Sequence, residues 1–285
     1  MTVPIDVSDW RPAPFAVAGE TVFAVGDVHG CANELRALLD AVAPLARERP
    51  ATRRIVYLGD IVDRGPDNIG ALALWSEDAA ARGVDRIDRV ISNHEMMMLL
   101  TLAGEAHAAK AETMWRSDGM GGEMVLAEMR AACRDPLAPP TYALAVAALG
   151  EGVMRHLMLQ RSHVRVGNAL FVHGGLDGRA DPEAFLASPW TAFTDARWAW
   201  ITRGFLDWQG GFGGTLVVHG HTPPAKHWPL THMEDPHLFL HDRLGLDGGS
   251  AVTGIVTAAE IQDGRYRILK AGTRREATAP GSSSG

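Results

Sequence analysis

The chain has 285 residues, of which 46% are hydrophobic and 21% are charged, and its formal net charge is -7. This length suits one large domain or two small ones, and the composition provides enough apolar residues for a substantial core. Proteins that bind nucleic acids nonspecifically use clusters of Lys and Arg to neutralise phosphates, so an acidic chain predicts no nucleic-acid partner.

Cysteine usage and hydropathy indicate the cellular context. Cys31 and Cys133 lie far apart, which excludes a disulfide framework and favours a reducing compartment. Residues 1–20 lack a basic region followed by a long apolar run, and no segment reaches the roughly 20 apolar residues that a membrane helix needs. We therefore expect no signal peptide, no membrane contact and a cytoplasmic location.

The first third of the chain alternates short apolar runs with segments of helical period. Residues 21–25 and 54–58 are apolar runs followed by Gly-Asp, and residues 89–92 form a third short run, so each predicts a strand. Residues 35–42 place apolar side chains on one helical face, and residues 68–81 also predict a helix. This alternation predicts an α/β fold with parallel strand pairs.

The rest of the chain predicts helices first and then strands again. Residues 104–160 are rich in Ala, Met and Glu and mostly helical in period, so we expect a helical insertion over the core, with a preceding helix at residues 96–103. Further strands are expected at residues 169–172, 215–218, 238–240, 254–261 and 266–269, the last two joined by a hairpin at 263–264.

These elements suggest a simple domain organisation. We expect residues 1–20 to form an N-terminal extension and residues 21–270 to form one domain. Residues 271–285 are small and polar, and they predict a disordered tail.

Acidic, imidazole and amide side chains follow five of the predicted strands. In chain order the motifs are Asp27-Val28-His29-Gly30, Asp60-Ile61-Val62-Asp63-Arg64-Gly65, Asn93-His94-Glu95, His173-Gly174-Gly175 and His219-Gly220-His221-Thr222. Each motif alone is explained as well by a helix cap or a core histidine as by a functional site. Because ligands bind beyond the carboxyl ends of strands in open α/β sheets, five such motifs in one chain are expected to converge.

The chemistry of these donors favours a metal site. Mixed oxygen and nitrogen ligands suit Mn, Fe or Zn, and their number exceeds what one ion requires. A pair of ions bridged by one carboxylate is the arrangement used for in-line displacement at phosphorus.

The motifs GDVHG, GDIVDRGPDN, SNHE, VHGG and HGHTP together closely resemble the phosphoprotein phosphatase family of calcineurin-like metallophosphoesterases, in particular its bacterial and phage members. The resemblance extends from about Thr21 to Ile261. It implies a central β-sandwich with helices on both outer faces, in agreement with the alternation of strands and helices. It also implies a hydrolase with two divalent metal ions, with Mn favoured over Fe or Zn.

The resemblance assigns metal ligands residue by residue. It implies Asp27, His29 and the bridging Asp60 for the first ion, and Asp60, Asn93, His173 and His221 for the second. His221 is favoured over His219 because the family's ligand immediately precedes the threonine of this motif. His219 and Glu95 are then interpreted as structural.

The resemblance also implies catalytic roles. Arg64 would bind phosphate, because a guanidinium offers a bidentate fork to two phosphate oxygens, and Asn93 would also contact the substrate. Neighbouring side chains diverge, so His94 is better suited to act as a general acid than to share a metal with Asn93. Asp63 would orient His94 and raise its pKa.

Two departures from the family pattern leave alternatives open. Asp247 stands in Asp-Gly-Gly-Ser where the family usually has Asp-Thr-Gly-Ala, and it is either a carboxylate that supports a ligand histidine or a turn residue. Many relatives carry a second phosphate-binding arginine after a Trp-Ile pair. Here Arg203 comes one residue late, so it is either a substrate-binding residue or a surface arginine.

The implied reaction is hydrolysis of phosphomonoesters by direct attack of a hydroxide that bridges the two metals. Two substrates of this chemistry remain open, a phosphoprotein or a small phosphoester. A serine/threonine-type protein phosphatase of broad specificity is favoured by DRG at 63–65 and NHE at 93–95, because dinucleoside polyphosphate hydrolases of the diadenosine tetraphosphatase kind often replace that aspartate and read NHD. A non-catalytic binding module should have lost at least one ligand, and none is missing.

Overall fold

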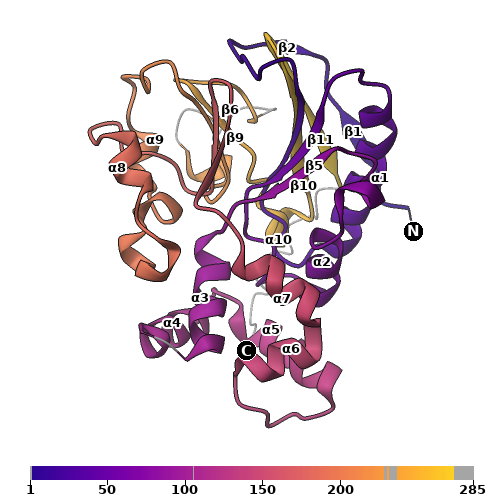
Figure 1. The fold of residues 1–285 in the computed structure, drawn as a ribbon, viewed down its shortest axis with the longest axis vertical. Coiled ribbons are helices and arrows are strands. Elements are labelled where there is room, and N and C mark those ends of the chain that lie inside the picture. Colours follow the sequence, from indigo (N-terminus) through magenta and orange to yellow (C-terminus); the bar gives the residue numbers. More distant parts are fainter. Residues whose placement is uncertain (1, 105, 228–229, 231–235, 273–285) are drawn as a thin grey trace, which may run out of the picture.

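The computed structural model describes residues 2–104, 106–227, 230 and 236–272. Two sheets pack face to face at its centre, and helices cover the outer face of each sheet (Figure 1). The expected fold, a β-sandwich flanked by helices, is therefore confirmed. Among the described residues, no helix is both long and apolar enough to cross a bilayer.

The first sheet combines parallel and antiparallel strands. Its spatial order is β1 (Ile5–Val7), β11 (Arg265–Ala271), β10 (Val256–Gln262), β3 (Thr21–Val25), β4 (Arg53–Tyr57) and β5 (Arg86–Arg89), with β2 (Arg11–Pro12) also paired to β11. Strands β3, β4 and β5 are parallel, and Val25, Tyr57 and Arg89 lie side by side at their ends. The turns after these strands consequently leave the sheet at one edge.

The second sheet is smaller and repeats this arrangement. Its order is β6 (His163–Val166), β7 (Ala169–Val172), β8 (Leu216–His219) and β9 (Arg243–Gly245), and β7, β8 and β9 are parallel. All residues of β3, β7 and β8 are buried, as expected for strands covered on both faces. Val56 and Leu58 of the first sheet share an apolar cluster with Phe171 and Val218 of the second.

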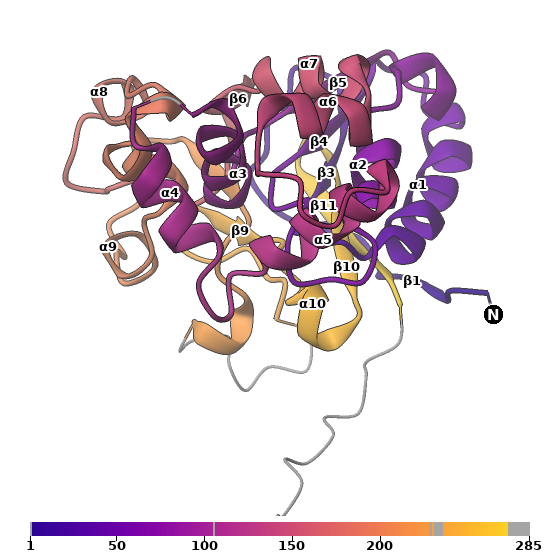
Figure 2. The same ribbon diagram turned by 90° about the horizontal axis from the view of Figure 1, so that it is seen from below.

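Helices cover the outer faces and one end of the sandwich. They are α1 (Ala32–Arg47), α2 (Asn68–Trp75), α3 (Asn93–Ala103), α4 (Ala108–Trp115), α5 (Gly122–Cys133), α6 (Tyr142–Leu149), α7 (Glu151–Met158), α8 (Pro182–Leu186), α9 (Arg203–Leu206) and α10 (Ser250–Thr253). The predicted apolar face of α1 is confirmed, because Leu35, Leu38, Leu39 and Val42 are buried. Helices α4–α7 gather at the end of the sandwich where α3 begins (Figures 1 and 2).

Three predicted boundaries near the site differ from the structure. The third strand lies at Arg86–Arg89 rather than at 89–92, because the Ser92 hydroxyl caps α3 by accepting the backbone N–H groups of His94 and Glu95. Helix α3 therefore begins at Asn93 rather than at 96. The helix predicted to reach residue 81 ends at Trp75, and a short 3-10 turn follows at Ala79–Arg82.

The predicted strand at 238–240 is wrong, since only Leu240 forms an isolated bridge and the strand is β9 at Arg243–Gly245. Strand β6 was not predicted, because Val164 and Val166 alternate with exposed Arg165 over only four residues. The predicted N-terminal extension contains β1 and β2, which are only three and two residues long and largely exposed, and both pair with β11. Strand β11 runs to Ala271, and residues 273–285 of the predicted tail lie outside the described residues.

Candidate metal centre and active site

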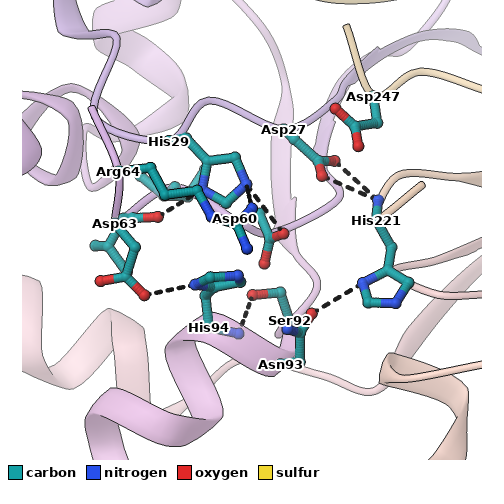
Figure 3. Close-up of polar contacts among 12 residues, drawn as sticks. Asp27, His29, Asp60, Asp63, Arg64, Ser92, Asn93, His94, His221 and Asp247 are labelled. Atoms are coloured by element: carbon teal, nitrogen blue, oxygen red, sulfur yellow. Dashed lines mark hydrogen bonds and ion pairs between the residues drawn. The ribbon is translucent and has the colours of Figure 1, made fainter. Parts of the chain in front are cut away.

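Polar residues that follow the parallel strands of both sheets meet at one place. Figure 3 shows the carboxylates of Asp27, Asp60 and Asp247 near His29, His94, Asn93 and His221. A cleft of about 910 Å³ opens over them, and its lining includes His29, Asp60, Arg64, Asn93, His94, Arg203, His221, Lys226 and Asp247. The strand-end motifs thus converge although they lie far apart in sequence.

Several of these residues have backbone conformations that are unusual for non-glycine residues. The φ angles are 45° for His29, 52° for Asp60, 78° for Asp63, 67° for Arg64 and 67° for His221. Such left-handed conformations cost about 1 kcal/mol or more each and persist where the surrounding structure holds them. Gly65 allows the two turns to pack closely enough to hold these conformations, because a Cβ there would lie 1.7 Å from the His29 carbonyl oxygen.

The Asp60 carboxylate lies between two groups of histidines. Its Oδ2 is 3.4 Å from His29 Nε2, and its Oδ1 is 3.4 Å from His173 Nε2. Two triads hold possible ligand atoms within 4.8 Å of one another, His29–Asp60–His94 and Asp60–His173–His221. Asp60 Oδ1 is buried and accepts no hydrogen bond from the described residues. A shared carboxylate with an unsatisfied oxygen fits a site for two cations bridged by one ligand.

In the second triad, the imidazole of His173 is fixed in an orientation that suits metal ligation. His173 Nδ1 lies 2.8 Å from the Leu58 carbonyl oxygen and donates to it, so Nε2 presents its lone pair to the site. Asn93 Oδ1 lies 2.9 Å from His173 Nε2 and 3.1 Å from His221 Nδ1. The structure therefore brings together all four residues expected at the second ion.

The first triad differs in one respect from the ligand set implied by the resemblance. This triad contains His94 and not Asp27. The Asp27 carboxylate instead accepts the backbone N–H of His221 at 2.9 Å. His29 Nδ1 donates to the Val62 carbonyl oxygen at 2.9 Å, so His29 Nε2 faces Asp60. Asp27 is buried at the same site, and a Cβ at Gly220 would lie 2.0 Å from its Oδ1.

The protonation of the site suits cation binding. Burial lowers the pKa of His173, and it lowers the pKa of His221 to about 3, so both imidazoles are neutral near pH 7. Burial and the nearby charges of Asp247 and Asp60 raise the pKa of Asp27, and burial raises that of Asp247. Crowded buried carboxylates beside neutral imidazoles form a donor set that divalent cations stabilise.

Asp60 itself is favoured as an anion. Burial acts to raise its pKa, but the facing imidazoles of His173, His94 and His29 outweigh burial and bring the pKa well below its usual range. Burial likewise opposes protonation of His29, yet the hydrogen bond and charge of Asp60 raise the pKa of that imidazole overall.

A second polar pair lies beside the triads. His94 Nδ1 is 2.5 Å from Asp63 Oδ2, and both side chains are buried. The pairing agrees with the orienting role implied for Asp63. The sequence did not single out Trp115 of α4, whose indole N–H donates to the same Asp63 carboxylate. No motif marks this residue, because its partner is set by tertiary packing.

Glu95 holds the segment that carries Asp60. Its carboxylate accepts the backbone N–H groups of Asp60 at 3.0 Å and Ile61 at 2.8 Å, and it also accepts the Ser92 hydroxyl. The side chain is completely buried. Glu95 therefore has a structural role, because its side chain fixes the turn after β4.

Three cationic side chains line the cleft. Arg64 Nε donates to the Gly119 carbonyl oxygen at 2.9 Å, and its Nη1 lies 3.0 Å from His29 Nε2. Arg203, at the start of α9, is exposed and lines the same cleft. Lys226 lines it as well, although no sequence motif marks it.

Asp247 makes the contact expected of a turn residue and also lies beside the site. It lines the cleft beyond β9, and its charge contributes to the raised pKa of Asp27. Its Oδ1 also accepts the Gly249 N–H at 2.7 Å, as a turn residue would.

Comparison with known proteins gives a consistent picture. Residues 20–226 match the family model described as calcineurin-like phosphoesterase. Serine/threonine-protein phosphatase 1 of Salmonella typhimurium is 34% identical over 40% of this chain and 42% of its own length. The symmetrical bis(5'-nucleosyl)-tetraphosphatase of Nitrosospira multiformis is 34% identical over 33% of this chain and 30% of its own length. The matched segment thus spans less than half of either relative.

The likeness to solved structures concerns the fold. A crystal structure of a mutant cold-active protein tyrosine phosphatase superposes with a TM-score of 0.51 at 17% identity, covering 87% of this chain and 77% of that one.

We expect Asp60→Asn to lower the metal content of the protein, because an amide oxygen bridges two cations poorly. Protein loaded with Mn²⁺, desalted and measured by inductively coupled plasma mass spectrometry should carry about two ions per chain in the wild type and about one or fewer in the variant. Glu151→Gln, on the exposed surface of α7, is the matched control and should bind as the wild type does. Equal metal content in Asp60→Asn and the control would contradict the shared-ligand arrangement.

Glu95→Ala is expected to destabilise the fold. It leaves the three buried backbone N–H groups of Asp60, Ile61 and Val62 without this acceptor. At about 1–3 kcal/mol each, the free energy of unfolding should fall by about 3 kcal/mol or more. Urea denaturation measures this as a lower midpoint. Glu112→Ala, which removes an exposed ion pair with Arg116, should cost less than about 1 kcal/mol. A loss in Glu95→Ala no greater than in this control would refute the role of Glu95.

Proposed function

The chain belongs to the calcineurin-like phosphoesterase family, and from this premise we propose that it hydrolyses phosphomonoesters as a serine/threonine-type protein phosphatase of broad specificity. The observation that carries the proposal is the Asp60 carboxylate shared by two histidine groups, next to the buried His94–Asp63 pair. The shared carboxylate suits a pair of cations, and the imidazole–carboxylate pair suits transfer of a proton.

We assign Asp27, His29 and Asp60 to one ion, and Asp60, Asn93, His173 and His221 to the other. Mn is the metal we propose, because carboxylate, imidazole and amide donors suit it, with Fe and Zn as alternatives. When bound, the ions lower the pKa of water and polarise the phosphoryl group. His94 is left out of this set because its Nδ1 is engaged by Asp63 at 2.5 Å, which suits a proton donor whose Nε2 is directed at the cleft.

The protein's own groups would then bind the phosphate and assist departure of the leaving group. Arg64 lines the cleft with its guanidinium beside His29, where it can donate to two phosphate oxygens. Asn93 can donate its amide N–H to the phosphate while its oxygen faces the histidines. His94 Nε2 protonates the leaving oxygen as its bond to phosphorus breaks, and Asp63 stabilises the imidazole that donates.

The substrate assignment rests on the cleft and on two motifs. A volume of about 910 Å³ is larger than a phosphate group needs and leaves room for the side chain and flanking residues of a phosphopeptide. The DRG motif at Asp63–Gly65 and the NHE motif at Asn93–Glu95 favour the protein phosphatases of the family over the dinucleoside polyphosphate hydrolases. Cys31 and Cys133 form no disulfide with each other, which supports the proposal that the enzyme acts in the cytoplasm.

A dinucleoside polyphosphate hydrolase is the second candidate, and a specific observation favours it. Arg203 and Lys226 add two cations to the cleft beyond Arg64, and additional phosphates of a polyphosphate chain would satisfy them. The Nitrosospira relative carries the name of such an enzyme.

A substrate panel separates the two candidates. With Mn²⁺ supplied, we expect kcat/KM on a phosphoserine peptide to exceed kcat/KM on diadenosine tetraphosphate by about tenfold or more. The reason is that the DRG and NHE motifs favour a protein phosphatase. Phosphate release measured side by side gives the ratio, and Asp60→Asn is the control for contaminating activity. The inverse ratio would transfer the assignment to the polyphosphate substrate, and absence of activity on both would refute the proposed function.

A further inference from the structure

Trp115, the last residue of α4, is completely buried and contacts the catalytic pair of the proposed mechanism. Its indole Nε1–H lies 2.9 Å from Asp63 Oδ1 and 3.0 Å from Asp63 Oδ2, so one donor spans both carboxylate oxygens. Asp63 Oδ2 is in turn 2.5 Å from His94 Nδ1. The three side chains form a buried series from indole to carboxylate to imidazole.

This arrangement restricts the rotation of the Asp63 carboxylate. A carboxylate on a short side chain can turn about its terminal bond, because that torsion is broad. A donor that faces both oxygens fixes the plane of the group, and Oδ2 then stays directed at His94 Nδ1. With Nδ1 engaged, His94 keeps its Nε2 toward the cleft, which it lines.

The segment that carries Trp115 is itself packed tightly against the site. A Cβ at Gly122 would lie 2.6 Å from the Trp115 ring, and a Cβ at Gly121 would lie 2.3 Å from the Arg64 backbone nitrogen. The Gly119 carbonyl oxygen accepts Arg64 Nε at 2.9 Å. The end of α4 therefore contacts Asp63 and the turn that follows it contacts Arg64, so both residues are held from outside the strand-end motifs.

We propose that Trp115 is a positioning residue for proton donation, acting through Asp63 on His94. This inference rests on the proposed function, since it requires His94 to act as the acid. The proton moves from His94 Nε2 to the leaving oxygen as the P–O bond breaks, and solvent returns a proton to His94 afterwards. Trp115 neither gains nor loses a proton in this sequence.

Core packing alone would also bury a tryptophan, and Trp75 provides the comparison. Trp75 of α2 lies in the same apolar cluster, is equally buried, and its indole nitrogen has no hydrogen-bond partner among the described residues. Trp75→Phe and Trp115→Phe thus remove the same volume. Only the second removes a hydrogen bond to Asp63.

The test compares kcat and KM of both variants on two substrates. A phosphoserine peptide has an alkoxide leaving group that needs a proton, whereas p-nitrophenyl phosphate releases a stable phenolate. For Trp115→Phe we expect kcat on the peptide to fall by about tenfold with KM nearly unchanged, and kcat on p-nitrophenyl phosphate to fall by less than about threefold. Trp75→Phe should leave both substrates within about twofold of the wild type.

The same substitution in an Asp63→Asn background completes a double-mutant cycle. If Trp115 acts through Asp63, Trp115→Phe should cause little further loss of peptide kcat once Asp63 is altered. Equal losses of kcat on the two substrates, or losses that add in the double variant, would overturn the positioning role. The proposed function would still stand in that case, provided that the wild type is active. A wild type inactive on both substrates would overturn the proposed function and this inference with it.

A fold-preserving replacement covers the case in which Trp115→Phe does not fold. Incorporating benzothienylalanine at position 115 keeps the shape of the ring and replaces the N–H with sulfur. Urea denaturation checks that the free energy of unfolding is retained. The same selective loss on the peptide supports the positioning role, and wild-type kcat on the peptide overturns it.

Discussion

The arrangement of the site depends on one buried carboxylate that faces two groups of imidazoles. Each oxygen of Asp60 lies 3.4 Å from a histidine nitrogen, one from His29 and the other from His173. An anion this deeply buried is stable only if positive charge lies close to it, either on protonated imidazoles or on bound cations. Cations held by Asp60 and the two histidine groups would meet this requirement, and the surrounding residues hold Asp60 in place.

The backbone around Asp60 is held from two directions. Glu95, in the first turn of α3, accepts the N–H groups of Asp60 and Ile61, which leaves the Asp60 side chain free to face the histidines. Gly59 allows the turn after β4 to approach the start of α3, since a Cβ there would lie 2.6 Å from the Ser92 side chain. These contacts hold Asp60 in its left-handed conformation, and the same helical turn presents Asn93 and His94 to the cleft.

The convergence of the strand-end motifs could be predicted from the sequence. Neighbouring parallel strands end at the same edge of a sheet, so the residues that follow them lie close together. Register explains the convergence, since His219 pairs with Gly245 and both His221 and Asp247 follow two residues later. The strand before Asp247 was nevertheless misplaced, since residues 238–240 are all apolar whereas β9 reads Arg-Leu-Gly. The contacts of the helical insertion were not predictable in this way. Helical period explains why Trp115 is buried, but only the packing of α4 against the turn after β4 gives it Asp63 as a partner.

The most direct test of the shared carboxylate is electron paramagnetic resonance of the Mn²⁺-loaded protein. Two Mn²⁺ ions bridged through Asp60 are exchange-coupled and should give the multiline spectrum of a dinuclear centre, replaced in Asp60→Asn by the sextet of isolated ions. A wild-type protein that showed only the isolated-ion sextet at saturating Mn²⁺ would contradict the account.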